Sequence, residues 1–171
     1  AKHFAAYGAA IGGRDYNTVD ISMQTLHNVY LPPFKVAAKN GVASFMCSFN
    51  EINGVPSSGN AYLYDLLYKQ WGYKGLVVSD WASIWEMVVH GYSKDKEMAA
   101  IQAGVTIDME SNIYSSQLKK LVKTGKVPEA TLNDAVRKVL VQKYQLGLFD
   151  NPYRYCNSQK EANEILTDSH R

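Results

Sequence analysis

The 171 residues of the chain are enough for one domain with a substantial hydrophobic core. The formal net charge is only +2, so the composition gives no electrostatic reason to expect nucleic acid or an anionic membrane as a partner. The sequence contains no run of eighteen apolar residues, so no membrane-spanning helix is predicted. Its twelve tyrosines and three tryptophans fit a core, an interface or a surface that contacts carbohydrate.

The first part of the sequence reads as the tail of a strand followed by a loop and a helical region. Residues 1–4 have the character of a strand end, and the glycines and polar residues of 8–17 predict a loop. Apolar residues then recur at spacings of three and four over 23–40, with Ser22 in position to cap a helix. The Pro-Pro pair at 32–33 interrupts this pattern, so we expect two short helical pieces.

Strands and helices alternate through the rest of the chain. Strands are predicted at 42–49, 76–79 and 105–109, and helices at 61–70, 83–90, 95–103, 113–124 and 129–146. Asn60 stands in position to cap the first of these helices. Residues 50–56 carry strong turn chemistry and are expected to form a loop. Residues 151–171 are polar and irregular, which predicts a linker with a short helix around 161–166. The cysteines, Cys47 and Cys156, match no metal or redox spacing, so we expect one buried thiol and one loop thiol.

The alternating order of elements predicts the fold class. Strands that alternate with helices form βαβ units around a parallel sheet, so the chain is expected to be α/β. Only four strands are predicted, whereas a closed (β/α)₈ barrel needs about 250 residues. The chain is therefore either a small open α/β domain or part of a larger barrel. A start in mid-strand and an end in a linker favour the second interpretation.

Residues 75–81 form the stretch that most clearly indicates a catalytic or binding site. A short apolar strand ends there on Asp80 and Trp81. Chemistry in parallel α/β folds sits at the carboxyl ends of strands, where an aspartate can act as a nucleophile, a general base or a metal ligand. A tryptophan beside it offers a flat apolar surface for a sugar ring. The alternative is that Asp80 caps the helix that starts near Ser83.

Other polar and aromatic residues also follow the predicted strands. In a barrel they would converge on one rim; they are Lys2, His3, the segment 46–50, Asp80, Trp81, Asp108 and Glu110. A cation beside Asp80, an imidazole and aromatic rings can together hold a neutral polyhydroxy ligand. Each residue also has a purely structural explanation, because His3 can be a satisfied structural histidine and Met46 can be core packing.

Several motifs occur together in one order and spacing. They are Lys-His-Phe at 2–4, Gly-Gly-Arg-Asp-Tyr-Asn at 12–17, the segment 48–56 and the Ser-Asp-Trp stretch within 75–81. In this arrangement the chain resembles glycoside hydrolase family 3, and most of all its bacterial periplasmic-type β-glucosidases. Residues 146–153 are similar to the exit of that family's barrel. The resemblance extends over nearly the whole chain.

The resemblance implies a domain organisation. The family has an N-terminal (β/α)₈ TIM-type barrel followed by an α/β sandwich domain. Residues 1–150 would be the C-terminal half of the barrel, with four βα units, and residues 151–171 a linker toward the sandwich domain. The partners of this segment would then be the remainder of the barrel and the sandwich domain. The acid/base, a glutamate, would lie beyond Arg171, and two further sugar contacts would lie upstream of Ala1.

The resemblance also implies roles for individual residues. Asp80 matches the catalytic nucleophile. Lys2 and His3 match the pair that hydrogen-bonds the sugar in the subsite of the cleaved residue. Met46 lines that subsite, and Trp81 matches an aromatic residue at its entrance.

Two other residues are expected to lie outside the catalytic set. Phe49 stands where many relatives have a tyrosine, so it lacks the hydroxyl and is not counted as catalytic. Glu110 is the only candidate for the catalytic acid within the chain. A structural role, as a rim residue or a helix-capping carboxylate, is favoured over the catalytic one.

The function implied is that of a retaining exo-β-glycosidase, a β-glucosidase that removes terminal non-reducing β-D-glucosyl residues through a covalent glycosyl-Asp intermediate. Its substrate would be a β-glucoside or a short β-glucan oligosaccharide, and its location periplasmic or secreted. No metal and no cofactor are expected. The alternatives are a β-xylosidase or other exo-β-glycosidase and, from another class, a sugar-binding barrel protein without turnover.

Overall fold

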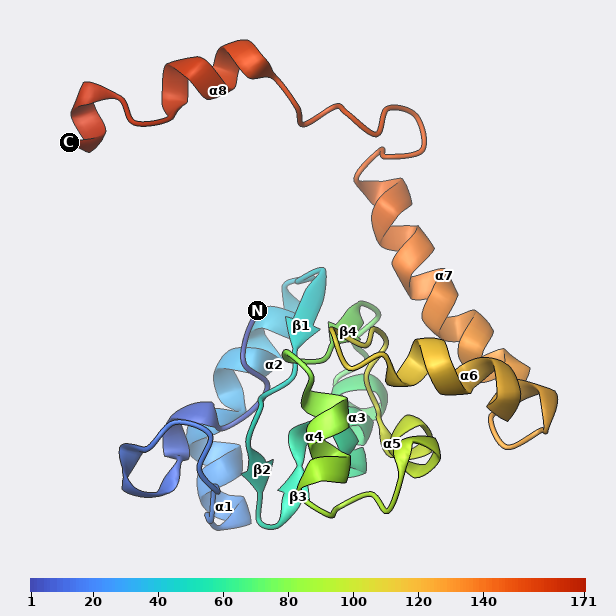
Figure 1. Cartoon of the computed structure of the whole chain (residues 1–171). Coiled ribbons are helices and arrows are strands. Elements are labelled where there is room, and N and C mark those ends of the chain that lie inside the picture. The colour runs from blue at the N-terminus through green and yellow to red at the C-terminus, as the bar shows by residue number, and fades with distance from the viewer. The chain divides into compact units, whose positions relative to one another are not determined.

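The computed structural model describes residues 1–171. The chain forms two compact units, residues 1–138 and residues 139–171. The first unit combines short parallel strands with helices, so the predicted α/β class is confirmed (Figure 1). No helix of the chain combines the length and the apolar character that a membrane crossing requires.

A small parallel sheet lies at the centre of the first unit. Strand β1 (Ser44–Met46) and strand β4 (Leu76–Val78) lie side by side and pair in parallel, with Phe45 opposite Val77 (Figure 1). Phe4 forms a parallel bridge to the residue after β1, and Ile107 forms one to the last residue of β4. Four chain segments thus lie across the sheet in sequence order, and their carboxyl ends meet at one edge, as expected for consecutive parallel units.

The strands are shorter than the sequence predicts. The strand expected at 42–49 is reduced to β1, and the strand expected at 105–109 is reduced to the single bridge at Ile107. Side chains replace part of the backbone ladder here. The Met109 N–H donates to Ser79 Oγ at 2.8 Å, and the Val77 N–H donates to Thr106 Oγ1 at 3.2 Å. Because these amides bond to hydroxyl groups, regular pairing does not continue along the fourth segment.

The segment 50–56, expected as a loop, contains a β-hairpin. Its strands are β2 (Glu51–Ile52) and β3 (Val55–Pro56), which pair in antiparallel. The turn consists of Asn53 and Gly54, with φ of 51° and 82°. An Asn-Gly pair with positive φ at both positions is favoured in two-residue hairpin turns, so the turn signal was correct and the strands on either side were missed.

The helical region near the N-terminus is broken, as the prolines predicted. It comprises α1 (Met23–Thr25), a π-helical turn (Leu26–Tyr30) and α2 (Pro32–Lys39). Ser22 caps α1, because its side chain accepts the Thr25 N–H. Pro32 stands at the start of α2, where its missing N–H costs no hydrogen bond.

The remaining helices of the first unit form close to the predicted positions. They are α3 (Ala61–Asp65) with a following π-helical turn (Leu66–Gln70), α4 (Ser83–Val89), α5 (Lys96–Gln102), α6 (Ile113–Lys123) and α7 (Glu129–Gln145), the last of which continues into the second unit. Asn60 caps α3 as expected, and Asp95 caps α5 by accepting the Met98 N–H at 2.8 Å.

The hydrophobic core anchors the N-terminal segment against the sheet. Phe4 is fully buried, and the centroid of its ring lies 5.6 Å from the ring centroid of Phe45 in β1 and 5.3 Å from that of Phe34 in α2. Val77 of β4 is buried in the same cluster. Burial of this kind typically stabilises by about 1.5–3 kcal/mol for each large apolar side chain. The residues just before Phe4 are thereby held beside the carboxyl end of β1.

The second unit contains the end of α7, one further helix and a 3₁₀ turn at Asp168–His170. Its helix α8 (Ser158–Glu164) starts earlier than the helix expected at 161–166, because Asn157 caps it by accepting the Lys160 N–H. The Leu146 carbonyl accepts hydrogen bonds from the side chains of Arg154 and Tyr155. Cys156 is exposed and Cys47 is buried, as predicted for the two thiols.

Candidate active site

Asp80 lies directly after β4, at the carboxyl edge of the sheet. Its Oδ1 accepts the Trp81 N–H at 2.7 Å, and its side chain is 18% exposed. Helix α4 starts at Ser83 with Ala82 at its N-cap, and no side chain caps it. Only the backbone carbonyl of Asp80 receives the Ser83 N–H. The helix-capping interpretation is therefore wrong, and Oδ2 of Asp80 is left without a backbone donor.

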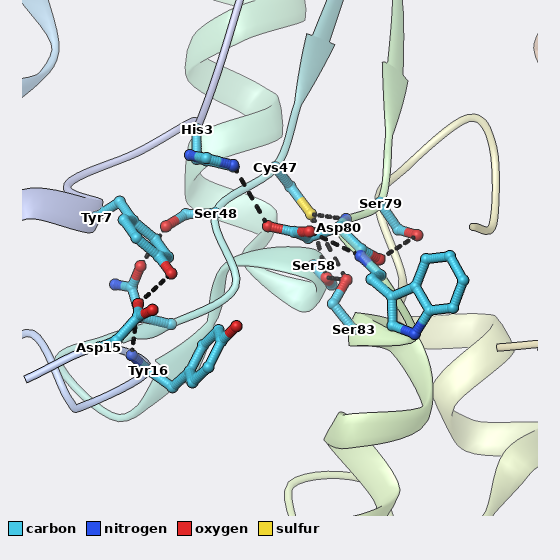
Figure 2. Close-up of polar contacts among 12 residues, drawn as sticks. His3, Tyr7, Asp15, Tyr16, Cys47, Ser48, Ser58, Ser79, Asp80 and Ser83 are labelled. Carbon is cyan, nitrogen blue, oxygen red and sulfur yellow. Dashed lines mark hydrogen bonds and ion pairs between the residues drawn. The ribbon is translucent and has the colours of Figure 1, made fainter. Parts of the chain in front are cut away.

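His3 is the side chain that faces this carboxylate. Its Nε2 lies 3.7 Å from Oδ2 of Asp80, and Figure 2 shows the imidazole directed at that oxygen. Two backbone hydrogen bonds hold the segment in place, from the Phe4 N–H to the Met46 carbonyl and from the Ser48 N–H to the Phe4 carbonyl. The structure thus brings together two of the predicted site residues, from positions far apart in the sequence.

The other predicted site residues surround this pair less closely. Lys2 is exposed and forms no hydrogen bond or ion pair, so the expected cation beside Asp80 is absent and His3 occupies that position. Met46 is half-buried at the end of β1. The Trp81 side chain follows Asp80 and is 61% exposed, which leaves its ring available to a ligand.

Tyr7 and Asp15 lie near the His3–Asp80 pair and were not predicted as site residues. The Tyr7 ring packs on His3 with 4.8 Å between centroids, and the Tyr7 hydroxyl donates a hydrogen bond to Asp15 (Figure 2). That hydrogen bond, partial burial and the charges of Asp15 and Asp80 raise the pKa of Tyr7 far above its usual range. The Tyr7 hydroxyl therefore stays protonated and donates its hydrogen bond to Asp15 close to the Asp80 carboxylate. The polar run at 14–17 was the only sequence signal for this arrangement.

The two carboxylates after the fourth strand segment have different surroundings. Oδ2 of Asp108 accepts the N–H groups of Ile113 and Tyr114, so it holds the start of α6. Glu110 is exposed, and its carboxylate forms no hydrogen bond or ion pair. No group of three or more His, Cys, Asp or Glu side chains is arranged to hold a metal ion.

Comparisons with known proteins agree on one family. The family model described as "Glycosyl hydrolase family 3 N terminal domain" matches residues 1–141. The chain is 44% identical over 172 residues to the periplasmic beta-glucosidase of Salmonella typhimurium, a match that covers 98% of this chain and 22% of that protein. It is 39% identical to a putative beta-xylosidase of Formosa agariphila, with 98% of this chain and 23% of that protein covered.

A solved structure has the same fold over nearly the whole chain. The beta-glucosidase of Listeria innocua superposes with a TM-score of 0.92 at 38% identity, over 98% of this chain and 24% of that one. The same enzyme has been solved with glucose and with isofagomine. The chain spans about a quarter of the length of these relatives, and its helices and parallel strands match part of their N-terminal TIM-barrel domain.

Proposed function

This chain belongs to glycoside hydrolase family 3, a family of enzymes, and on that premise we propose that the protein carrying it is a β-glucosidase. The enzyme removes terminal non-reducing β-D-glucosyl residues from β-glucosides or short β-glucan oligosaccharides. The observation that carries this proposal is the carboxylate of Asp80, which is free of helix capping and faces His3 at the carboxyl edge of a parallel sheet. The glucose and isofagomine complexes of the Listeria innocua relative support the choice of sugar.

In the proposed reaction, Asp80 is the nucleophile and configuration is retained. Its carboxylate attacks the anomeric carbon while the bond to the leaving oxygen breaks, and a carboxylic acid gives that oxygen a proton. Water then attacks the anomeric carbon of the glycosyl-Asp intermediate. The former acid, now a carboxylate, takes a proton from this water, and the Asp80 carboxylate is regenerated.

The acid/base of this reaction is proposed to come from outside the segment. Asp15 already receives the Tyr7 hydroxyl, and Asp108 is bonded to two amides at the start of α6. Glu110 is exposed, and no hydrogen bond or ion pair holds its carboxylate in place. These contacts support an acid supplied by a further domain, which in turn supports the interpretation of 1–150 as a half-barrel and 151–171 as a linker.

The remaining site residues are proposed to bind the sugar. His3 donates a hydrogen bond to a sugar hydroxyl next to the reacting carbon, and exposed Lys2 reaches another hydroxyl when the sugar is present. Met46 lines the subsite of the cleaved sugar. The Trp81 ring provides an apolar platform at the entrance, because its indole is accessible and follows the nucleophile directly.

A β-xylosidase is the second candidate function. It is favoured by the Formosa agariphila relative, whose name is putative beta-xylosidase. Xylose lacks the hydroxymethyl group of glucose, so the two activities differ only in contacts at that position. The ratio of kcat/KM for 4-nitrophenyl β-D-glucoside and β-D-xyloside, measured on the complete gene product, decides between them.

The nucleophile is tested by trapping. The complete gene product is incubated with a 2-deoxy-2-fluoroglucoside carrying a good leaving group and is then digested for peptide mass mapping. Label on the peptide that contains Asp80 is the expected result. Label on another carboxylate would remove Asp80 from its role, and absence of label together with absence of turnover would favour a sugar-binding protein.

The location is proposed to be periplasmic or secreted. The support is the name of the Salmonella typhimurium relative, which is a periplasmic beta-glucosidase. Osmotic-shock fractionation of the native host, followed by immunoblotting, tests this proposal. Release of the protein with periplasmic markers, or its recovery from the medium, is the expected result, and retention with cytoplasmic markers would contradict it.

A further inference from the structure

A buried network of one thiol and two hydroxyl groups lies behind Asp80. Cys47 follows β1, Ser58 lies in a 3₁₀ turn (Ser57–Gly59) and Ser83 starts α4, and all three are buried. The Cys47 Sγ lies 3.2 Å from Ser58 Oγ and 3.8 Å from Ser83 Oγ, and the two hydroxyl oxygens are 2.7 Å apart (Figure 2). The proposed mechanism uses none of these groups, so their placement needs another explanation.

The network ends on the backbone of the proposed nucleophile. The Asp80 N–H donates to Cys47 Sγ at 3.4 Å. Burial raises the pKa of the Cys47 thiol, so the sulfur carries its proton and can accept from Asp80 while it donates to a serine hydroxyl. A neutral acceptor is required here, because a thiolate beside the Asp80 carboxylate would place two negative charges together.

Cys47 also connects the two strands that carry the site. The Cys47 N–H donates to the carbonyl of Val78, two residues before Asp80, at 2.9 Å. Cys47 also forms a parallel bridge to Phe4, the residue after His3. Through its backbone and its side chain, this single residue therefore contacts the segments of both members of the His3–Asp80 pair. A displacement of Cys47 would change the distance and the direction between these two side chains.

We infer that Cys47 is a positioning residue for the proposed hydrolysis, and that its thiol, held by Ser58 and Ser83, sets the backbone orientation from which the Asp80 carboxylate attacks. This inference rests on the proposed function. Attack on an anomeric carbon requires a near-linear approach, so a small rotation of the Asp80 backbone lowers the rate of the chemical step more than it lowers sugar binding. The network thus acts on kcat and leaves KM largely unchanged.

The test compares Cys47→Ala, which removes the acceptor, with Cys47→Ser, which restores a hydroxyl donor and acceptor. Cys156→Ala is the matched control, because that thiol is exposed. In the complete gene product, Cys47→Ala is expected to lower kcat for 4-nitrophenyl β-D-glucoside by about 10- to 100-fold with little change in KM. Cys47→Ser is expected to recover most of this loss. Ser58→Ala, which removes only the next link, should give a smaller loss in the same direction.

Hydrogen exchange provides a second measurement that needs no substrate. The amide of Asp80 is expected to exchange faster in Cys47→Ala than in Cys47→Ser, because only the alanine variant lacks its acceptor. Unchanged kcat in Cys47→Ala, equal losses in Cys47→Ala and Cys47→Ser, or unchanged exchange at Asp80 would each overturn the inference. Wild-type protein that fails to turn over any β-glycoside would instead overturn the proposed function, and the exchange data would still decide whether Cys47 holds the Asp80 amide.

Discussion

At the scale of single residues, two aspartates that follow neighbouring strand segments have opposite surroundings. Asp108 binds two amides at the start of α6, so its carboxylate stabilises a helix. Asp80 precedes α4 but binds only the amide of its own neighbour, Trp81. The residue before each helix has a left-handed φ, 54° for Ala82 and 56° for Asn112, so this conformation does not distinguish the two turns. The Ser83 N–H of α4 donates instead to the Asp80 carbonyl and the Trp85 N–H to Ser111 Oγ, so neither amide reaches the Asp80 carboxylate. Position after a strand therefore does not decide the role of a carboxylate, whereas the direction of nearby amides does.

Asp80→Asn in the complete gene product is expected to lower kcat by about 10³-fold or more, because the amide cannot form the glycosyl ester. The fold should be retained, since the side chain has the same shape and caps no helix. Steady-state kinetics and the midpoint of thermal unfolding check both statements. Asp20→Asn, at an exposed position without side-chain partners, is the matched control. Near-normal turnover in well-folded Asp80→Asn would exclude Asp80 as the nucleophile.

Lys2→Ala is expected to lower kcat/KM while stability changes by less than about 0.5 kcal/mol. The reason is that exposed Lys2 has no partner within the chain, so its proposed contacts form only with the sugar. Kinetics and denaturant unfolding of the variant, beside Lys35→Ala as an exposed control, measure the two effects. A sharp loss of stability with unchanged kcat/KM would mean that Lys2 is structural.

At the scale of elements, side-chain hydrogen bonds connect short strands and helices to the segments beside them. Asn53 in the β2–β3 turn exchanges two hydrogen bonds, both of 2.9 Å, with the backbone of Ile21, and so ties the hairpin to the preceding segment. Glu97 of α5 accepts hydrogen bonds from Lys120 of α6 and from Lys126 beyond it. Long-range side-chain contacts of this kind fix the arrangement of neighbouring elements.

The Glu97 contacts predict a pH dependence of stability. The hydrogen bonds from Lys126 and Lys120 lower the pKa of Glu97 from 4.5 to about 2. A carboxyl group with a lower pKa in the folded state stabilises the protein above its unfolded pKa and loses this contribution as the pH falls toward the folded value. Glu97→Gln should therefore be less stable than wild type at pH 6, and the difference should disappear between about pH 4.5 and 2.

Unfolding midpoints of both proteins across this pH range, at low and at high salt, test that dependence. The contacts are near the surface, so added salt should reduce the difference at pH 6. A difference that stays constant from pH 6 to pH 2 would show that the lysines do not stabilise the ionised form of Glu97.

At the scale of the whole molecule, the sheet is open on both sides. Its segments run in the order Phe4, β1, β4 and Ile107, and the two outer segments each have only one neighbour. In a barrel both would pair with further strands, and exposed strand edges otherwise invite association. The relatives are about four times as long as this chain.

The isolated 171 residues are therefore expected to be catalytically silent and to associate in solution. Two open sheet edges would drive the association, and the proposed mechanism needs an acid from outside this segment for turnover. Light scattering coupled to size-exclusion chromatography and an assay on an aryl β-glucoside are the measurements. Robust turnover by a monomer of 19.1 kDa would place an acid, with Glu110 the first candidate, within this segment.

The sequence by itself determined the α/β alternation, the caps at Ser22 and Asn60, the break at the prolines and the family. These depend on local chemistry: hydrophobic period, capping side chains and a proline nitrogen without a proton. The tertiary structure alone decided which groups meet across the sheet. It brought His3 rather than Lys2 to Asp80, placed Tyr7 and Asp15 beside them, and set Cys47 behind them. Such contacts depend on strand register and on the direction of individual amides, which result from packing over the whole unit and leave no pattern in the local sequence.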